Sequence, residues 1–213
     1  MFPLGSVLLP GMVLPLHVFE DRYRALVRDV LDAPEPEFGV VLIERGSEVG
    51  GGDVRATVGC SARIVEAAAT PDGRWAVVAV GTSRLRVESW LPDDPYPLAE
   101  VGEWGDEPDP PDRWADALTD AEVALRRTAA LGSELGLPAL PEDLELSEDP
   151  VLRSYQLGVL APVGPLDRQR LLCCPGPALR VALLVELLAE QEELLRARLG
   201  GWAHDDPPDG PTG

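Results

Sequence analysis

Lysine is absent from this chain of 213 residues, and all 18 basic residues are arginine. A guanidinium group stays protonated in proteins, so arginine cannot serve as the general base of a Ser–Lys protease dyad. The phosphate-binding loop of P-loop ATPases also requires a lysine. These residues therefore form neither kind of active site. An arginine-only composition is typical of a genome rich in G+C, and selection against tagging on lysine is the alternative explanation.

Cysteine and histidine are also scarce: the chain has Cys60, the adjacent Cys173 and Cys174, and the histidines His17 and His204. They provide neither an even disulfide framework nor the C-x-x-C spacing of zinc and redox sites. We therefore expect no metal, no cofactor and no catalytic residue. For the cysteine pair the sequence favours core packing over a nucleophilic or redox role. For His17 it favours a structural or surface role over that of a general base.

Long apolar runs are missing as well. No segment approaches the roughly eighteen apolar residues of a membrane-spanning helix. The apolar start of the chain has no basic segment before it and is interrupted by three prolines, unlike a secretory signal peptide. The sequence therefore predicts a cytoplasmic location.

Negative charge is abundant and unevenly distributed. The formal net charge is −19; residues 1–100 hold 15 acids against 9 arginines, and residues 101–213 hold 22 acids against 9. The excess lies in segments 103–112 and 142–149 and in the tail after Trp202, which are rich in proline or glycine, as expected of solvated connectors. Such a charge repels phosphate backbones, so the sequence argues against nucleic acid as a partner.

The first thirty residues combine two extended segments and a helix. Pro10-Gly11 predicts a turn between the extended segments. From Phe19 onward the apolar residues follow a helical period, and acidic residues in the first turn suit the helix dipole. We therefore expect the first helix to pack on a core through Phe19 and Tyr23. The whole apolar stripe comprises Phe19, Tyr23, Leu26, Val27, Val30 and Leu31.

The rest of the chain divides into a strand-rich and a helix-rich part. Alternating or continuous apolar runs predict strands at 38–43, 55–68 (two short strands near Gly59), 75–80, 84–88 and 98–101, in a curved antiparallel sheet. Leu85 and Val87 are expected on its core face. Helical spacing follows at Trp114, Leu118, Ala121 and Leu125, after Asp149-Pro150, and from Pro177 to Gly200-Gly201. Gly50-Gly51-Gly52 is expected at a hairpin tip.

Five motifs occur in order along the chain: F-P-L at 2–4, L-P-G-x-x-L-P-L-x-V-F-E-x-R-Y-R at 9–24, F-G-V-V at 38–41, V-G-x-x-A-R-I at 58–64 and G-x-x-R-L-R-V at 81–87. Together they resemble the amino-terminal substrate-binding domain of the ATP-dependent Lon proteases. A weaker likeness follows at 167–172 and in the leucine-rich segment after Arg180. Cys174-Pro175-Gly176-Pro177 replaces a stretch that is usually polar and helical in the family.

The resemblance implies an α+β fold: a PUA-like antiparallel β pseudo-barrel at 1–103, a small helical bundle at 112–200 and a disordered acidic tail at 201–213. It implies a stand-alone, non-catalytic module of protein quality control, without the ATPase and protease modules. Such a module would bind unfolded or apolar protein segments, and a protease or chaperone is its implied partner. A small-molecule-sensing regulatory module that uses the barrel–bundle cleft is the alternative.

Candidate peptide-binding residues lie in the second extended segment and at the helix start. A sheet edge or an apolar groove between the barrel and the helices would serve such binding. For Glu20 and Arg22 to Arg24, a helix cap and a structural ion pair compete with ligand binding. The candidate residues are Met12, Leu14, His17, Glu20 and Arg22.

Overall fold

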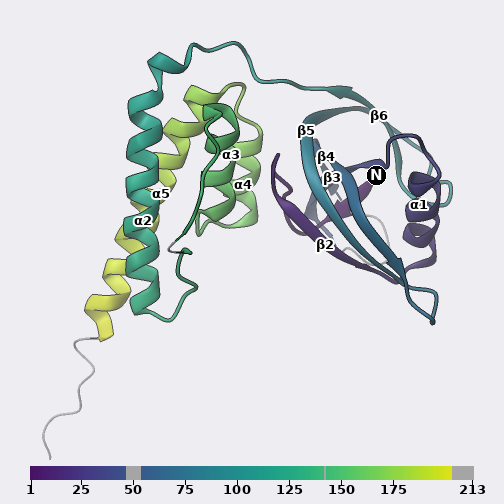
Figure 1. Ribbon diagram of the computed structural model, residues 1–213, viewed down its shortest axis with the longest axis horizontal. Coiled ribbons are helices and arrows are strands. Elements are labelled where there is room, and N and C mark those ends of the chain that lie inside the picture. The colour runs from purple at the N-terminus through teal and green to yellow at the C-terminus, as the bar shows by residue number, and fades with distance from the viewer. Residues whose placement is uncertain (47–53, 142, 203–213) are drawn as a thin grey trace, which may run out of the picture.

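The computed structural model describes residues 1–46, 54–141 and 143–202 of the chain. A strand-rich half comes first and a helical half follows (Figure 1). The first half contains β1 (Phe2–Leu4), β2 (Val13–Val18), α1 (Asp21–Leu31), β3 (Glu37–Arg45), β4 (Val54–Ala69), β5 (Trp75–Leu91) and β6 (Leu98–Glu103). The second contains a short 3-10 turn (Pro111–Arg113), α2 (Ala115–Glu134), α3 (Pro150–Leu160), α4 (Pro165–Leu172) and α5 (Pro177–Trp202).

The sheet is strongly curved but not closed into a full barrel. Its strands follow the order β1-β3-β4-β5-β2, and β6 also pairs with β5. All pairs are antiparallel except β1 with β3, which are parallel, so the expectation of an all-antiparallel sheet is wrong at this edge. The parallel pair arises because the chain crosses to the far edge as β2 and returns through α1 before it forms β3. The α+β fold itself is as the sequence predicts.

The two central strands are longer than the sequence suggested. β4 has 16 residues and β5 has 17, and register shifts bend them between Cys60 and Ala62 and between Ile64 and Glu66. Bulges of this kind raise the local twist without ending a strand. Gly59 therefore does not separate two strands. A Cβ there would lie 2.2 Å from the carbonyl oxygen of Val40, so glycine allows β3 and β4 to approach closely.

The helix α1 covers one end of the sheet, but Phe19 does not help to bury it. Tyr23, Leu26 and Val27 face the core, whereas Phe19 is 57% exposed, so the predicted burial of Phe19 is wrong. The helix begins at Asp21, and Phe19 directly follows the buried Val18 in extended chain. Because successive side chains of an extended segment point to opposite sides, Phe19 turns outward. Phe2 instead stacks on Tyr23, with ring centroids 4.2 Å apart.

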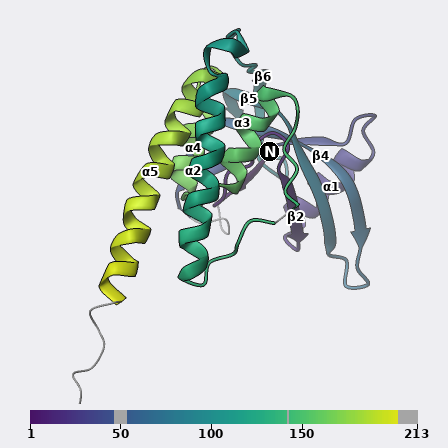
Figure 2. The ribbon, with the colours of Figure 1, turned by 60° about the vertical axis from the view of Figure 1, so that its left-hand side comes forward.

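The helical half agrees closely with the sequence pattern. The carboxylate of Asp149 accepts hydrogen bonds from the backbone N–H groups of Val151 and Leu152, at 2.8 and 2.9 Å, and so caps α3. α2 and α5 lie side by side (Figures 1 and 2). They share a buried core that includes Trp114, Leu118, Ala121, Leu125, Val181, Leu184 and Leu188.

The two halves are joined by a third apolar cluster. Val7, Leu9, Ala56 and Val58 of the strand-rich half pack with Tyr155 of α3, and with Leu42 and Leu172 they form this cluster. α3 and α4 lie between the sheet and the α2–α5 pair (Figures 1 and 2). The division at 103 and 112 stays a prediction.

Two of the expected features lie outside the residues that the structure describes. They are the hairpin tip at Gly50-Gly51-Gly52 and the acidic tail from residue 203. The last helix, α5, does not end at Gly200-Gly201 but continues to Trp202. Among the helices of the described part, none combines the length and the apolarity needed to cross a membrane.

Candidate functional site

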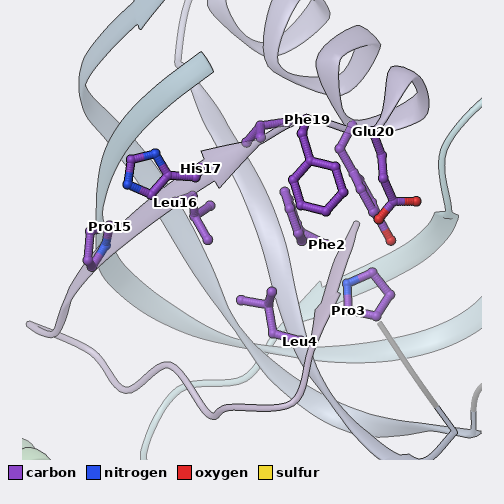
Figure 3. Close-up of a pocket in the computed structure, with 10 residues that line it drawn as sticks. Phe2, Pro3, Leu4, Pro15, Leu16, His17, Phe19 and Glu20 are labelled. Atoms are coloured by element: carbon purple, nitrogen blue, oxygen red, sulfur yellow. The ribbon is translucent and has the colours of Figure 1, made fainter. Parts of the chain in front are cut away.

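The two terminal strands of the sheet border a single open cavity. β1 and β2 stand at opposite ends of the strand order and are not paired with each other in the described chain. Between them lies a cavity of about 220 Å³, which we call the seam (Figure 3). The residues that line the seam are Phe2, Pro3, Leu4, Pro15, Leu16, His17, Val18, Phe19, Glu20 and Tyr23.

Strand alternation determines which groups of β2 reach this cavity. Leu14 and Val18 are buried, whereas Val13, Pro15 and His17 are exposed. The N–H of Gly81 donates to the carbonyl of Met12, so Met12 turns its carbonyl toward β5. Because opposed pairs in an antiparallel ladder alternate, residues 13, 15 and 17 turn their backbone groups away from β5, and of these Pro15 and His17 line the seam. Proline is tolerated at position 15 because no ladder hydrogen bond is lost there.

A carboxylate and an arginine stand at the rim of the seam. Nε of Arg22 donates to Oε2 of Glu20 at 3.0 Å, and the guanidinium of Arg22 lies 4.6 Å from the ring centroid of Tyr23. Glu20 occupies the N-cap position of α1 without a side-chain capping bond. The expected ion pair is therefore present and the expected cap is not. Both side chains stay about one-fifth exposed, so a ligand in the seam can reach them.

The structure brings only some of the sequence-predicted site residues together. His17 and Glu20 line the seam, and Arg22 pairs with Glu20. Leu14 is only 8% exposed and belongs to the core, and Met12 packs partly against that core. The pattern missed Phe2 and Phe19, which frame the seam as Figure 3 shows. Pro3 and Pro15 carried a signal for the two strands that border the seam, since prolines in a strand mark a sheet edge.

A wider hollow adjoins the seam. It measures about 460 Å³ and shares His17 and Phe19 with the seam. Trp75, at the start of β5, and the turn at Thr70 to Asp72 form its other side. The exposed ring of Phe19 therefore stands between two concave surfaces.

Asp106 forms a buried ionic junction between the two halves of the molecule. The guanidinium of Arg84, on β5, donates to Oδ1 of Asp106 at 2.7 Å, and that of Arg180, on α5, donates to the same oxygen. The hydroxyl of Tyr155 donates to the same carboxylate at 3.3 Å. Arg84 and Arg180 are 3% and 1% exposed. The prediction that residues 103–112 are merely a solvated connector is wrong at Asp106, because arginines from both halves converge on it.

The two arginines of this junction have further partners. Arg84 donates to the backbone carbonyls of Leu172, at 2.9 Å, and of Cys174, and its guanidinium stacks on Trp104. Arg180 donates to the hydroxyl of Ser154 at 2.8 Å. Burial lowers the pKa of Arg180, and Tyr155 and Asp106 oppose this shift. The junction therefore fixes the helical half against the sheet.

The cysteines lie in surroundings that suppress thiolate formation. Burial raises the pKa of the Cys60 thiol to about 12, and burial also raises the pKa values of Cys173 and Cys174. A thiol, unlike a thiolate, is a poor nucleophile and metal ligand. Within residues 1–46, 54–141 and 143–202, no three side chains of His, Cys, Asp or Glu are grouped to hold a metal ion.

We expect slow alkylation of all three cysteines in the folded protein. At pH 7.5 iodoacetamide should modify them at least tenfold more slowly than in the urea-unfolded chain, because their pKa values lie above the usual value of about 8.5. Mass spectrometry of timed samples measures the rates. Modification of Cys173 or Cys174 as fast as in urea would contradict the assignment to packing.

Comparisons with known proteins were consistent across sequence and structure. The family model of the ATP-dependent protease La (LON) substrate-binding domain matches residues 1–190. The chain is 29% identical over 198 residues to a Lon protease of Anaeromyxobacter dehalogenans and to Lon protease 2 of Myxococcus xanthus. Each match covers 90% of this chain but only 23% of the relative's length.

Two solved structures share the fold. A Lon N-terminal domain protein from Xanthomonas campestris superposes with a TM-score of 0.59 at 28% identity, and covers 87% of this chain and 95% of its own. The N-terminal domain of the Mycobacterium avium complex Lon protease gives a TM-score of 0.61 at 18% identity, with 88% of this chain and 97% of that one covered.

Proposed function

Because this chain belongs to the family of LON substrate-binding domains, we propose that it binds exposed apolar segments of unfolded or tagged proteins and catalyses no reaction. The matched region corresponds only to the substrate-binding part of the relatives, and the chain spans 23% of their length. ATP hydrolysis and proteolysis therefore do not transfer to it. The absence of lysine is consistent with this proposal.

The observation that carries the proposal is the open seam with Phe19 at its rim. An aromatic side chain that is 57% exposed beside an apolar cavity loses water contacts when a ligand covers it. Few polar side chains converge there, which favours an apolar protein segment over a small polar ligand.

The alternative, a small-molecule sensor in the barrel–bundle cleft, has less support. The hollow beside α3 that Gly11 and residues 144–146 border measures about 150 Å³. Small-molecule pockets usually measure about 300–1,000 Å³. The ionic junction around Asp106 and the apolar cluster with Tyr155 already fill part of the contact between the halves. A protein segment in the seam is the better-supported occupant.

We further propose an adaptor or regulatory role in the cytoplasm. A domain that holds an unfolded segment without cleaving it can deliver it to a protease or chaperone, or compete with the full protease for it. The proposed site needs no cofactor. The acidic surface disfavours nucleic acid as a competing ligand.

Apolar recognition predicts a weak salt dependence of affinity. The dissociation constant for a fluorescently labelled unfolded protein should change less than tenfold between 0.01 and 0.15 M salt, although the Debye length falls from about 30 to about 8 Å. Fluorescence anisotropy titration at the two ionic strengths measures the change. A tenfold or greater weakening would assign binding to the acidic segments instead. Absence of binding to several unfolded proteins, with the chain shown folded by circular dichroism, would refute the proposed function.

A further inference from the structure

The two strands that border the seam both lack a backbone donor at their centre. Pro3 is the middle residue of β1 and Pro15 lies within β2, and neither has an N–H group. On β2, residues 13, 15 and 17 turn their backbone groups away from β5, so Pro15 interrupts the series of donors on that free edge. β1 pairs with β3 through Phe2 to Leu4, and proline fits there only where its nitrogen faces away from β3.

These prolines oppose recognition by strand addition. A peptide that adds a strand to a sheet edge needs a regular series of N–H donors and C=O acceptors on that edge. Natural proteins use proline on exposed edges to prevent such pairing. The seam offers mainly carbonyl acceptors at Pro3 and Pro15, so a bound segment cannot form a continuous ladder on either strand.

The volume and lining of the seam suit a single inserted side chain. A cavity of about 150 Å³ lined by apolar residues is known to accept a benzene ring, and the seam measures about 220 Å³. Its walls include Phe2, Leu4 and Leu16, and Figure 3 shows these side chains grouped around the opening. One aromatic or large aliphatic side chain therefore fits.

The carboxylate of Glu20 at the rim favours a basic residue in the bound segment, close to the inserted side chain. Glu20 is the only acidic residue among those that line the seam, and its two carboxylate oxygens can accept further hydrogen bonds beside the one from Arg22. The chain as a whole carries −19, and residues 1–100 carry an excess of six acids over arginines. The net negative charge of the chain favours a bound segment with arginine or lysine close to its apolar anchor over a segment with an acidic residue there.

Resting on the proposed function, we infer that the seam binds an extended protein segment without strand addition. One bulky apolar side chain of the segment enters the seam, and a basic residue two positions away in the segment pairs with Glu20. Residues two apart in an extended chain point to the same side, about 7 Å apart. The recognised pattern is therefore an aromatic residue and an arginine or lysine separated by one residue.

Four labelled nonapeptides test this inference on the full chain. The first has Phe and Arg two residues apart in a Ser/Thr background, the second replaces Phe with Ala, the third replaces Arg with Glu, and the fourth carries N-methyl groups on the two amides that flank Phe. Relative to the first peptide, we expect at least tenfold weaker binding of the second and two- to fivefold weaker binding of the third. The fourth should change less than threefold. Abolished binding of the N-methylated peptide would establish strand addition and overturn the inference.

Variants of the protein locate the site. Phe19→Ala should weaken binding of the first peptide at least threefold, and Val13→Ala is the matched control, because Val13 is 56% exposed on the same segment but does not line the seam. Glu20→Gln should abolish the preference for Arg over Glu, and Arg22→Gln should increase it by releasing Glu20. Thermal melts verify that each variant is folded.

The possible failures are distinguishable. If the chain binds unfolded proteins but Phe19→Ala and Val13→Ala behave alike, the seam is refuted as the site and the proposed function stands. If the preference for Arg persists in Glu20→Gln, the assigned charge pairing is wrong. If the chain binds no unfolded protein, the proposed function fails first.

Discussion

Replacing Asp106 with alanine is expected to destabilise the protein by about 3–5 kcal/mol, because it leaves two buried arginines without their shared carboxylate. Arg84 retains its carbonyl partners, whereas Arg180 retains the neutral hydroxyl of Ser154, which does not compensate its charge. A cation left uncompensated in a buried site is costly. Urea unfolding followed by circular dichroism measures the loss.

The control for this experiment is Glu107→Gln. Glu107 is the next acidic residue in the same segment, and it is exposed. Its backbone N–H donates to the carbonyl of Pro175 at 2.8 Å, which the substitution preserves. Its effect should stay within about 0.5 kcal/mol. A loss below 1 kcal/mol for Asp106→Ala would show that the junction does not hold the halves together.

The second large effect is expected at Tyr23. Its side chain is 4% exposed and stacks on Phe2 in the core under α1. Tyr23→Ala should lower the free energy of unfolding by about 3–5 kcal/mol, through lost burial and the cavity that remains. Chemical denaturation of the variant and of the wild-type protein gives the difference.

Phe19→Ala is the matched comparison for Tyr23→Ala. The two aromatic residues lie one helical turn apart in sequence, but Phe19 is 57% exposed. Its removal should change stability by less than about 0.5 kcal/mol. Equal losses for the two variants would mean that Phe19 contributes to the core, contrary to the structure. The same variant thus separates binding from stability.

Local sequence patterns predicted most of the elements correctly. The cap at Asp149 was predictable because it depends on residues two or three positions away, and the helical core positions from Trp114 to Leu125 follow one period. The alternation at Leu85 and Val87 likewise predicted which face is buried. Short-range geometry decides each of these features.

The predictions that were wrong depend on contacts between segments far apart in the sequence. The parallel pairing of β1 with β3 depends on residues about 38 positions apart in the register, from Phe2 to Val40. The same limitation applies to the candidate site. His17 and Glu20 were predicted, but Phe2 joins them only because the two ends of the sheet curve toward each other.

The sequence by itself determined the family and the α+β elements, because motifs and periodicity are properties of neighbouring residues. The tertiary structure alone decided that Phe19 faces solvent, that Asp106 joins two arginines 96 residues apart, and that two proline-containing edges border one cavity. Each of these three features depends on where distant segments of the chain meet. The physical reason is that burial and ion pairing are set by packing in space and not by order along the chain.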